Sequence, residues 1–408
     1  MTAGQDTLLV AVAIVLGCSP TDREASPDLV DSLGITVIEY PTSFAETPGA
    51  SWSTDPEPLF SLGESTPELH RVSTALFQAD GGVVVANGGA YELLFFDPTG
   101  QMRARVGREG GGPGEFHQLT SLSVGPADSL FAYDARENRI SVFDRNGVFA
   151  RALTLPGRDT LGPADQLDVM ITGQIIGAFH RRTSGVGLVR DSLVVMMFTP
   201  SGEPATHLGV FPHMHTDWGP HPIPGGQGSA TFPLPVPFSS LAAVGVGDGS
   251  IHVGLPDRYA VMRLTRDGPQ RVTRQRDPLG PVTEAHRDRL FAALAAGRLN
   301  TPELDVLRGL KGATTLPGFG RDPLTARLGE RTLLVTDLDG VWLQPFQLPS
   351  DSIDAPWPRF SADGLYEGVV MVPPGFRPTA VRGEIVLGVY QDSRDVEFVR
   401  AYRVVRRH

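Results

Sequence analysis

The chain has 408 residues, of which 41% are hydrophobic and 20% are charged, and its formal net charge is −11. This composition is typical of a globular protein, and the excess of acidic residues argues against nucleic acid or anionic lipid headgroups as nonspecific partners. The single cysteine, Cys18, excludes a disulfide framework, while 47 glycines and 35 prolines indicate many tight turns between short strands.

Residues 1–17 have the pattern of a secretion signal. The apolar run from Leu8 to Leu16 is much shorter than the about 20 residues of a membrane-spanning helix, and Gly17 and Cys18 follow it. This resembles a lipoprotein cleavage box, in which the cysteine is acylated and becomes the new N-terminus. The alternative is an incidental cysteine in a cleaved leader. By the same resemblance, Ser19 in place of an aspartate favours sorting to the outer membrane.

Residues 18–57 are predicted to form a tether with one docked strand. The segment is largely polar with scattered prolines, and only Ile35-Thr36-Val37-Ile38 reads as a strand.

A short turn signature recurs through the rest of the chain, each time between two apolar runs rich in β-branched residues. Its occurrences are Asp80-Gly81, Asp128-Ser129, Thr172-Gly173, Asp248-Gly249, Asp339-Gly340 and Arg382-Gly383. A supersecondary unit that repeats at this scale is typical of a β-propeller, in which each blade has four short strands.

A second signature, a polar residue followed three residues later by glycine, occurs once in each of the first five units. It is found at Asp97–Gly100, Asp144–Gly147, Thr199–Gly202, Thr265–Gly268 and Ser361–Gly364. A polar side chain at the first position can accept a backbone hydrogen bond, and glycine provides the positive φ that ends such a turn. Because both turns recur in the same order, we predict a six-bladed β-propeller over residues 58–408 rather than a plain β-sandwich.

The sixth unit has room for only three strands before the end of the chain. An incomplete last blade would leave an exposed edge, which proteins avoid. We therefore predict that an N-terminal strand, within Pro58-Leu59-Phe60-Ser61-Leu62-Gly63, completes the last four-stranded blade.

Two stretches carry a family resemblance. The run Val106-Gly107-Arg108-Glu109-Gly110-Gly111-Gly112-Pro113-Gly114-Glu115-Phe116, followed by Asn138-Arg139-Ile140-Ser141-Val142-Phe143-Asp144, is similar to NHL-type repeats. The chain resembles bacterial six-bladed β-propeller lipoproteins of this kind. The resemblance implies a propeller fold and a location in the cell envelope, whereas the members of that family include binding modules, scaffolds and a few enzymes.

Residues 211–240 are the segment with the most candidate ligands. This stretch is rich in proline and glycine and is expected to be a long loop. It contains His213, His215 and His221, which could bind zinc if the loop brought them together, and the alternative is a solvated loop. No cofactor is predicted from these residues beyond a possible zinc or calcium ion.

Residues 283–311 interrupt the β pattern between the fourth and fifth units. Leu290, Phe291 and Leu294 share one helical face, and Thr301-Pro302-Glu303 has the pattern of a helix start. We expect a small helical insertion that covers either the mouth of the channel or the edge of a blade.

These observations favour a lipid-anchored envelope propeller that binds a ligand or scaffolds proteins. Its expected partner is a peptide, a glycan or another protein at one end of the ring, its contact with the membrane is only through the anchor, and we expect a monomer. The alternative is a metal-dependent lyase or lactonase with a site in the propeller channel. No catalytic residue can be named, because Gly-x-Ser-x-Gly, His-Glu-x-x-His and EF-hand patterns do not occur.

Overall fold

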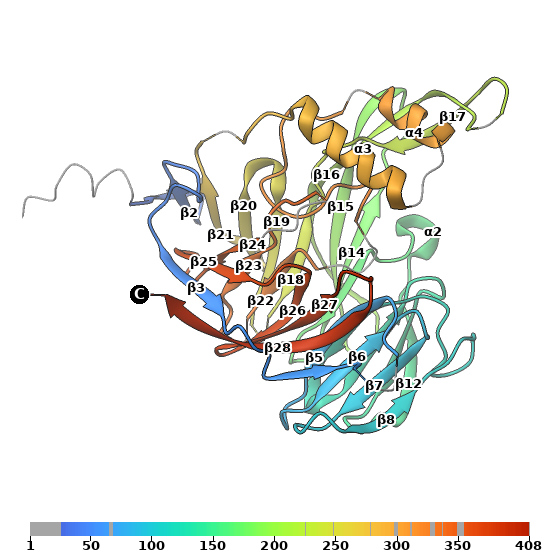
Figure 1. The fold of residues 1–408 in the computed structure, drawn as a ribbon, viewed down its shortest axis with the longest axis vertical. Coiled ribbons are helices and arrows are strands. Elements are labelled where there is room, and N and C mark those ends of the chain that lie inside the picture. The colour runs from blue at the N-terminus through green and yellow to red at the C-terminus, as the bar shows by residue number, and fades with distance from the viewer. Residues whose placement is uncertain are drawn as a thin grey trace, which may run out of the picture.

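The computed structural model describes residues 26–407 except 65–67, 225, 248, 278, 298–300, 311, 327–330, 337 and 349–354. Its strands form six antiparallel blades around a central axis, as predicted (Figure 1). The first blade contains β5 (Val72–Phe77), β6 (Val83–Asn87), β7 (Glu92–Phe96) and β8 (Met102–Val106), and the second contains β9 (Leu119–Val124), β10 (Leu130–Asp134), β11 (Arg139–Phe143) and β12 (Phe149–Thr154). The third contains β13 (Gln166–Val169), β14 (Ile175–Arg181), β15 (Gly187–Phe198) and β16 (Pro204–Pro222), and the fourth contains β18 (Ala243–Val246), β19 (Ile251–Leu255), β20 (Ala260–Thr265) and β21 (Gly268–Gln275). The fifth contains β22 (Leu333–Val335), β23 (Val341–Leu343), β24 (Ala355–Phe360) and β25 (Tyr366–Val372), and the sixth contains β26 (Phe376–Arg382), β27 (Ile385–Gln391) and β28 (Glu397–Arg407). Short helical turns interrupt the connections at η1 (Pro126–Asp128), α2 (Arg158–Leu161) and η2 (Pro256–Arg258).

Both turn signatures lie where the propeller requires them. The first series joins strands one and two of each blade, and the second joins strands three and four; Asp248 itself lies outside the described residues. In the first blade, Gly100 N donates to Asp97 O at 2.9 Å and Thr99 N donates to Asp97 Oδ1 at 2.9 Å. Both turn series therefore emerge at one end of the ring, and the other connections emerge at the opposite end.

An N-terminal strand closes the last blade, as predicted. β4 (Phe60–Leu62) pairs antiparallel with β28, with Ser61 opposite Arg400. The sixth blade contains no second turn of its own because its fourth strand comes from the other end of the propeller.

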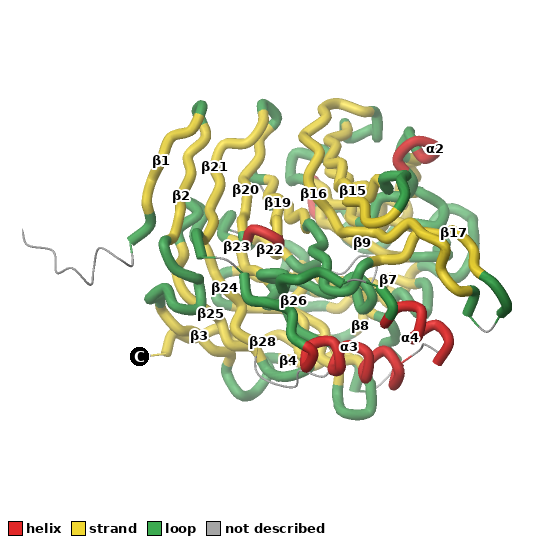
Figure 2. The backbone as a smooth tube through the Cα atoms, turned by 90° about the horizontal axis from the view of Figure 1, so that it is seen from above, coloured by secondary structure: helices red, strands yellow, loops and turns green. Residues whose placement is uncertain are grey.

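Residues 18–57 contain more structure than the single docked strand that the sequence predicted. β2 (Ile35–Tyr40) contains the predicted strand and pairs parallel with β21, while β1 (Asp28–Ser32) extends the same sheet (Figure 2). β3 (Ala50–Thr54) bridges the fifth and sixth blades by pairing with β25 and β28. The sequence analysis missed the β1–β2 hairpin because its turn places Leu33 at φ 55°. Leucine rarely adopts this left-handed conformation, so its presence did not indicate a turn.

Residues 211–240 are not the long loop that we expected. They form the outer half of β16 and β17 (Ser229–Pro235), a hairpin that extends the third blade to five strands. Pro233 and Pro235 are compatible with this hairpin because β17 is an edge strand, where a missing backbone donor breaks no ladder. Pro212, Pro220 and Pro222 lie on parts of β16 that pair with a strand on one side only.

The core consists of one hydrophobic cluster at each interface between neighbouring blades. Strands such as β6, β7 and β10 are buried along their whole length, because each sheet packs against a blade on both sides.

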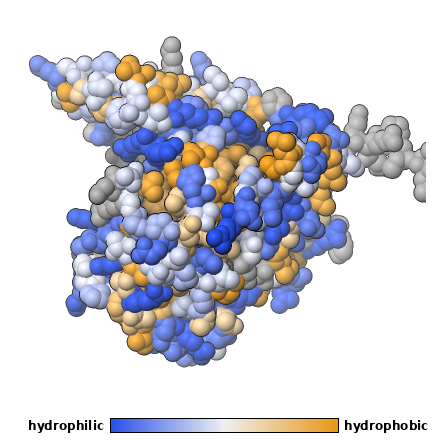
Figure 3. All heavy atoms as spheres, turned by 180° about the vertical axis from the view of Figure 1, so that it is seen from behind, coloured by the Kyte–Doolittle hydropathy of each residue, from blue (hydrophilic) through white to orange (hydrophobic). Residues whose placement is uncertain are grey.

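One face of the surface is drawn in Figure 3, where polar side chains predominate and apolar ones form separate patches. Among the described residues, no helix has the length and apolar character to cross a membrane.

The helical insertion between the fourth and fifth blades is present as predicted. It contains α3 (Glu284–Gly297) and α4 (Thr301–Arg308). Thr283 begins α3 as a cap, since His286 N donates to its Oγ1 and Thr283 N donates to His286 Nδ1. Phe291 of α3 and Leu304 of α4 pack with Leu234 of β17, so the helices cover the edge of the third blade.

Two arginines lie directly opposite each other in the fourth blade, and a buried histidine faces one of them on the other side. Arg263 of β20 faces His252 of β19 on one side and Arg271 of β21 on the other. Like charges in cross-strand pairs are destabilising, and within the described part of the chain the buried Nε of Arg263 has no hydrogen-bond partner.

We expect Arg263→Met to raise the free energy of unfolding by about 1 kcal/mol, because methionine removes the repulsion and the unpaired donor. Urea unfolding measures the change. Arg266→Met, in an exposed turn of the same blade, is the control and should leave stability unchanged; a loss of stability in Arg263→Met would contradict the argument.

Candidate functional site

A cavity of about 310 Å³ opens at the end of the ring opposite the two turn series. Three sides come from the third blade and the start of the fourth, and the remaining wall comes from the segment that follows the helical insertion. We call it the His180 cavity; its main lining residues are Asp165, Gln166, Ala178, His180, His213, Met214, Ala242, Arg321, Pro323, Ala326 and Thr332.

Asp191 organises the wall of this cavity. The side chain of Asp191 is fully buried, and its carboxylate lies 2.8 Å from His180 Nε2. Thr183 N donates to Asp191 Oδ1 at 2.8 Å, and Thr216 Oγ1 donates to Oδ2 at 2.7 Å. Burial alone would raise the pKa of Asp191, but these hydrogen bonds together outweigh it and lower the pKa below its usual value.

A β-bulge brings these side chains to one side of the sheet. The register of β15 against β16 shifts between Arg190, which faces His215, and Ser192, which faces Pro212. His213 and Thr216 are three residues apart on β16, so in a regular strand their side chains would point to opposite faces of the sheet. The bulge lets both side chains reach the face on which Asp191 lies. Bulges of this kind often re-aim side chains next to functional sites.

His213 is held neutral. Its ring packs against that of His180 with centroids 4.9 Å apart, and burial, followed by the nearby charge of His180, lowers its pKa to about 3. Ala242 N donates to His213 Nδ1 at 3.1 Å. Since Nδ1 accepts this bond, the single hydrogen of the neutral ring must lie on Nε2. His213 therefore offers the cavity a hydrogen-bond donor.

Asp165 completes the cluster. It lies just before β13, and its carboxylate and the nearest ring nitrogens of His180 and His213 all lie within 4.8 Å of one another. Burial raises the pKa of Asp165, while the charges of His180 and Arg182 act in the opposite direction. The neutral form of Asp165 is therefore retained to a higher pH than in an exposed aspartate.

The cluster fits hydrogen bonding better than it fits a metal ion. Calcium requires six to eight oxygen ligands, and a catalytic zinc ion takes three protein ligands with free lone pairs. On His213, Nδ1 already accepts a hydrogen bond and Nε2 bears the hydrogen, so neither nitrogen has a lone pair for a metal. Only Asp165 and His180 of this group remain as potential ligands.

The structure does not bring the three predicted histidines together. Among the described residues, the group of close ligand atoms contains His213 but neither His215 nor His221. The bulge interrupts the alternation that would have placed His213 and His215 on one face. His221 lies further out on β16, where its ring packs against Phe232 and its Nε2 lies 3.2 Å from Asp217 O.

Sequence reasoning missed Asp165, His180 and Asp191. A usable signal was present for Asp191, because an acidic residue inside the strand-like run Leu188–Phe198 must be paired if that strand is buried. Asp165 and His180 carried no such signal, since their proximity depends on how β13, β14 and β16 assemble.

Polar contacts cross the central channel. Arg331 forms an ion pair with Asp168 and donates to Leu122 O at 3.1 Å, while Ser123 Oγ donates to Asp168 Oδ1 at 3.0 Å. These residues tie the second, third and fifth blades together across the axis. A cavity of about 390 Å³ remains on the axis and is lined by residues of all six blades, including Arg331 and Asp168. The His180 cavity lies beside it.

Fold and cavity together define the chain as a six-bladed β-propeller protein. A family model named DUF5128 and described as a 6-bladed β-propeller matches residues 67–160. None of the proteins with curated descriptions matches the chain.

Several solved propeller structures are similar in fold. A candidate exported protein from Bacteroides fragilis is 10% identical, with 88% of this chain and 99% of that chain covered and a TM-score of 0.46. A member of the DUF4221 family from Bacteroides vulgatus is 10% identical, with 94% and 100% covered and a TM-score of 0.47. Virginiamycin B lyase from Staphylococcus aureus is 12% identical, with 84% and 87% covered and a TM-score of 0.40. At this level of identity the similarity concerns the fold alone.

Proposed function

We propose that this protein is a lipid-anchored β-propeller of the cell envelope that binds a ligand in the His180 cavity. The observation that carries the proposal is the cluster of buried His213 with half-buried Asp165 and His180, which lines a cavity of about 310 Å³, a size within the usual range for ligand sites. The partner is a peptide, a glycan or an exposed segment of another protein, and the propeller itself is a monomer.

The donors of the cavity define the chemistry of the ligand. His213 presents Nε2–H, and Arg321 is another lining residue with side-chain donors. A neutral group with carbonyl or hydroxyl oxygens, such as a peptide bond or a sugar, can accept from these donors without bringing an uncompensated charge into a buried site.

A thermal-shift panel tests this proposal. Short neutral peptides, mono- and oligosaccharides and simple lactones are added to the protein, and at least one of the first two classes is expected to raise the melting temperature. Ala326→Trp fills the cavity from its non-blade wall and should abolish the shift, whereas Ala205→Trp, which lines a different cavity, should preserve it. Equal shifts in both variants, or none in the wild-type protein, would count against the proposal.

The alternative function is a metal-dependent lyase or lactonase. One observation favours it: His180 is oriented by the carboxylate of Asp191, as ligand or base histidines often are. That function would require His213 to give up the bond from Ala242 N. Elemental analysis of the wild-type protein and of His180→Ala, both purified without chelator, distinguishes the binding function from the metal-dependent enzyme. One zinc per chain in the wild-type protein that is lost in the variant would establish the alternative. Our proposal expects no retained zinc in either protein.

The lipid anchor is part of the proposal, and Cys18 lies outside the described residues. We expect Cys18→Ala to abolish labelling by a fatty-acid analogue and to move the protein from the membrane fraction to the soluble fraction, because the thiol is the acylated group. Ser19→Ala keeps the thiol and should remain in the membrane fraction. Cys18→Ala protein that still sediments with membranes would refute the anchor.

A further inference from the structure

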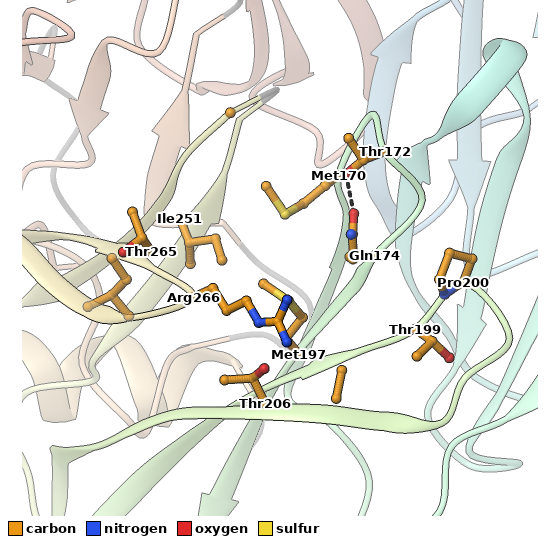
Figure 4. Close-up of a pocket in the computed structure, with 13 residues that line it drawn as sticks. Met170, Thr172, Gln174, Met197, Thr199, Pro200, Thr206, Ile251, Thr265 and Arg266 are labelled. Carbon is orange, nitrogen blue, oxygen red and sulfur yellow. Dashed lines mark hydrogen bonds between the residues drawn. The ribbon is translucent and has the colours of Figure 1, made fainter.

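A second cavity, of about 420 Å³, lies at the other end of the ring, between the third and fourth blades. Its walls are the two turn series themselves: Met170 and Thr172 come from the first turn of the third blade, and Thr265 and Arg266 come from the second turn of the fourth blade (Figure 4). It shares no lining residue with the His180 cavity.

The floor of this cavity is apolar. Met197, Ile251 and Leu264 belong to the hydrophobic cluster that joins the third and fourth blades, and Met170 packs against that cluster. At this end of the interface Met170 is partly exposed and Met197 is 8% exposed, while Ile251 and Leu264 are 2% and 1% exposed. Apolar surface left in contact with water favours an occupant that covers it, at roughly 25 cal/mol for each Å² buried.

A cationic group lies across the mouth. The Arg266 side chain points over the cavity toward Met197 and Thr206 (Figure 4). Arg266 is exposed, and within the described part of the chain it makes no ion pair or side-chain hydrogen bond. A planar guanidinium beside an apolar pocket is suited to a carboxylate, which it can bind through two parallel hydrogen bonds.

We propose that this cavity binds an aliphatic monocarboxylate, with the chain on Met170, Met197, Ile251 and Leu264 and the carboxylate on Arg266. The Thr206 hydroxyl lies at the same mouth and can donate a further hydrogen bond to the carboxylate. The volume is sufficient for a ligand of medium chain length. This site is independent of the function proposed for the His180 cavity.

The chain provides a matched control for Arg266. Arg145 occupies the same position in the second turn of the second blade, where Asp144-Arg145-Asn146-Gly147 corresponds to Thr265-Arg266-Asp267-Gly268. Arg145 does not line this cavity. Replacing either arginine removes one positive charge from the same kind of turn, so a difference between the two variants reports on the site and not on net charge.

The test is calorimetric titration of the wild-type protein with decanoate at pH 7.5, at concentrations below those at which it forms micelles. We expect one site per chain. Arg266→Gln should weaken binding about tenfold or more, because it removes a charge-assisted bidentate contact, and Arg145→Gln should leave binding unchanged. Decanol should bind at least about tenfold more weakly than decanoate to the wild-type protein, since it lacks the charge.

A filling variant tests the apolar part. Thr206→Trp places a large side chain in the mouth from the partly exposed β16 and should abolish decanoate binding, while its melting temperature shows whether the propeller remains folded. Absence of decanoate binding to the wild-type protein would overturn the proposal. Equal weakening by Arg266→Gln and Arg145→Gln, or unchanged binding in a folded Thr206→Trp protein, would also overturn it.

Discussion

Asp191→Ala is expected to destabilise the protein by about 3 kcal/mol, the largest effect of any single substitution at the His180 cavity. The buried carboxylate accepts from Thr183 N and Thr216 Oγ1 and lies 2.8 Å from His180 Nε2. Alanine removes all three interactions at once and leaves buried polar groups without partners. Equilibrium urea unfolding measures the shift in midpoint, with an unchanged slope indicating that the unfolded state is the same.

Asp217→Ala is the control for this substitution. Asp217 lies on the same strand, β16, and its carboxylate takes no part in the Asp191 network, so its replacement should change stability by less than about 0.5 kcal/mol. Asp191→Asn separates charge from shape: its oxygen can still accept from Thr183 N, while its NH₂ can donate to Thr216 Oγ1 or to an unprotonated His180 Nε2, so we expect a smaller loss than for alanine. A midpoint for Asp191→Ala equal to that of Asp217→Ala would show that the carboxylate does not hold the wall.

The second large effect is acid sensitivity caused by His213. Its folded pKa of about 3 is far below the usual 6.5, so between these values the unfolded chain binds a proton at this position and the folded chain does not. Stability therefore falls as the pH falls through that window, by about 1.4 kcal/mol per pH unit from this residue. The contribution is fully present above pH 6.5.

His213→Asn isolates this contribution. Asparagine cannot titrate, and its side-chain oxygen can take over the bond from Ala242 N. We expect the stability of the wild-type protein relative to this variant to fall by roughly 2 to 3 kcal/mol between pH 6.5 and pH 4.5, measured by urea unfolding at each pH. A difference that does not change with pH would contradict the buried, neutral state of His213.

Other buried groups affect the total pH profile, which is why the comparison with the variant is needed. Burial lowers the pKa of His252 to about 4, with a further lowering by Arg263, so this residue adds to the loss of stability in acid. Burial raises the pKa of Asp322 to about 6, and burial also raises that of Asp165, so these two carboxyl groups oppose the loss. These contributions are common to wild type and variant apart from their coupling to His213.

Several features of the fold were predictable from short stretches of sequence. Asp97–Gly100 and Asp144–Gly147 identify their turns because each contains both the acceptor and the glycine that the turn requires. The closing strand around Ser61 followed from counting strands and from the rule that edges are covered. The first inserted helix, α3, followed from the shared face of Leu290, Phe291 and Leu294, and the second, α4, followed from the helix-start pattern Thr301-Pro302-Glu303.

The candidate site was mostly hidden from such reasoning. The expected loop at 211–240 is a hairpin, because the prolines in its strands lie on the edge strand β17 or on parts of β16 that pair with a strand on one side only. The expected grouping of His213 with His215 and His221 failed because one bulge opposite Asp191 changed which side chains share a face.

The sequence by itself therefore determined the number of blades, their closure and the place of the helical insertion, since turn chemistry and strand patterning are encoded within a few neighbouring residues. Only the tertiary structure decided that Asp165, His180 and His213 face one cavity and that Arg266 lies over another. The physical reason is that both sites depend on strand register and on the packing of one blade against the next, which involve residues far apart in the chain.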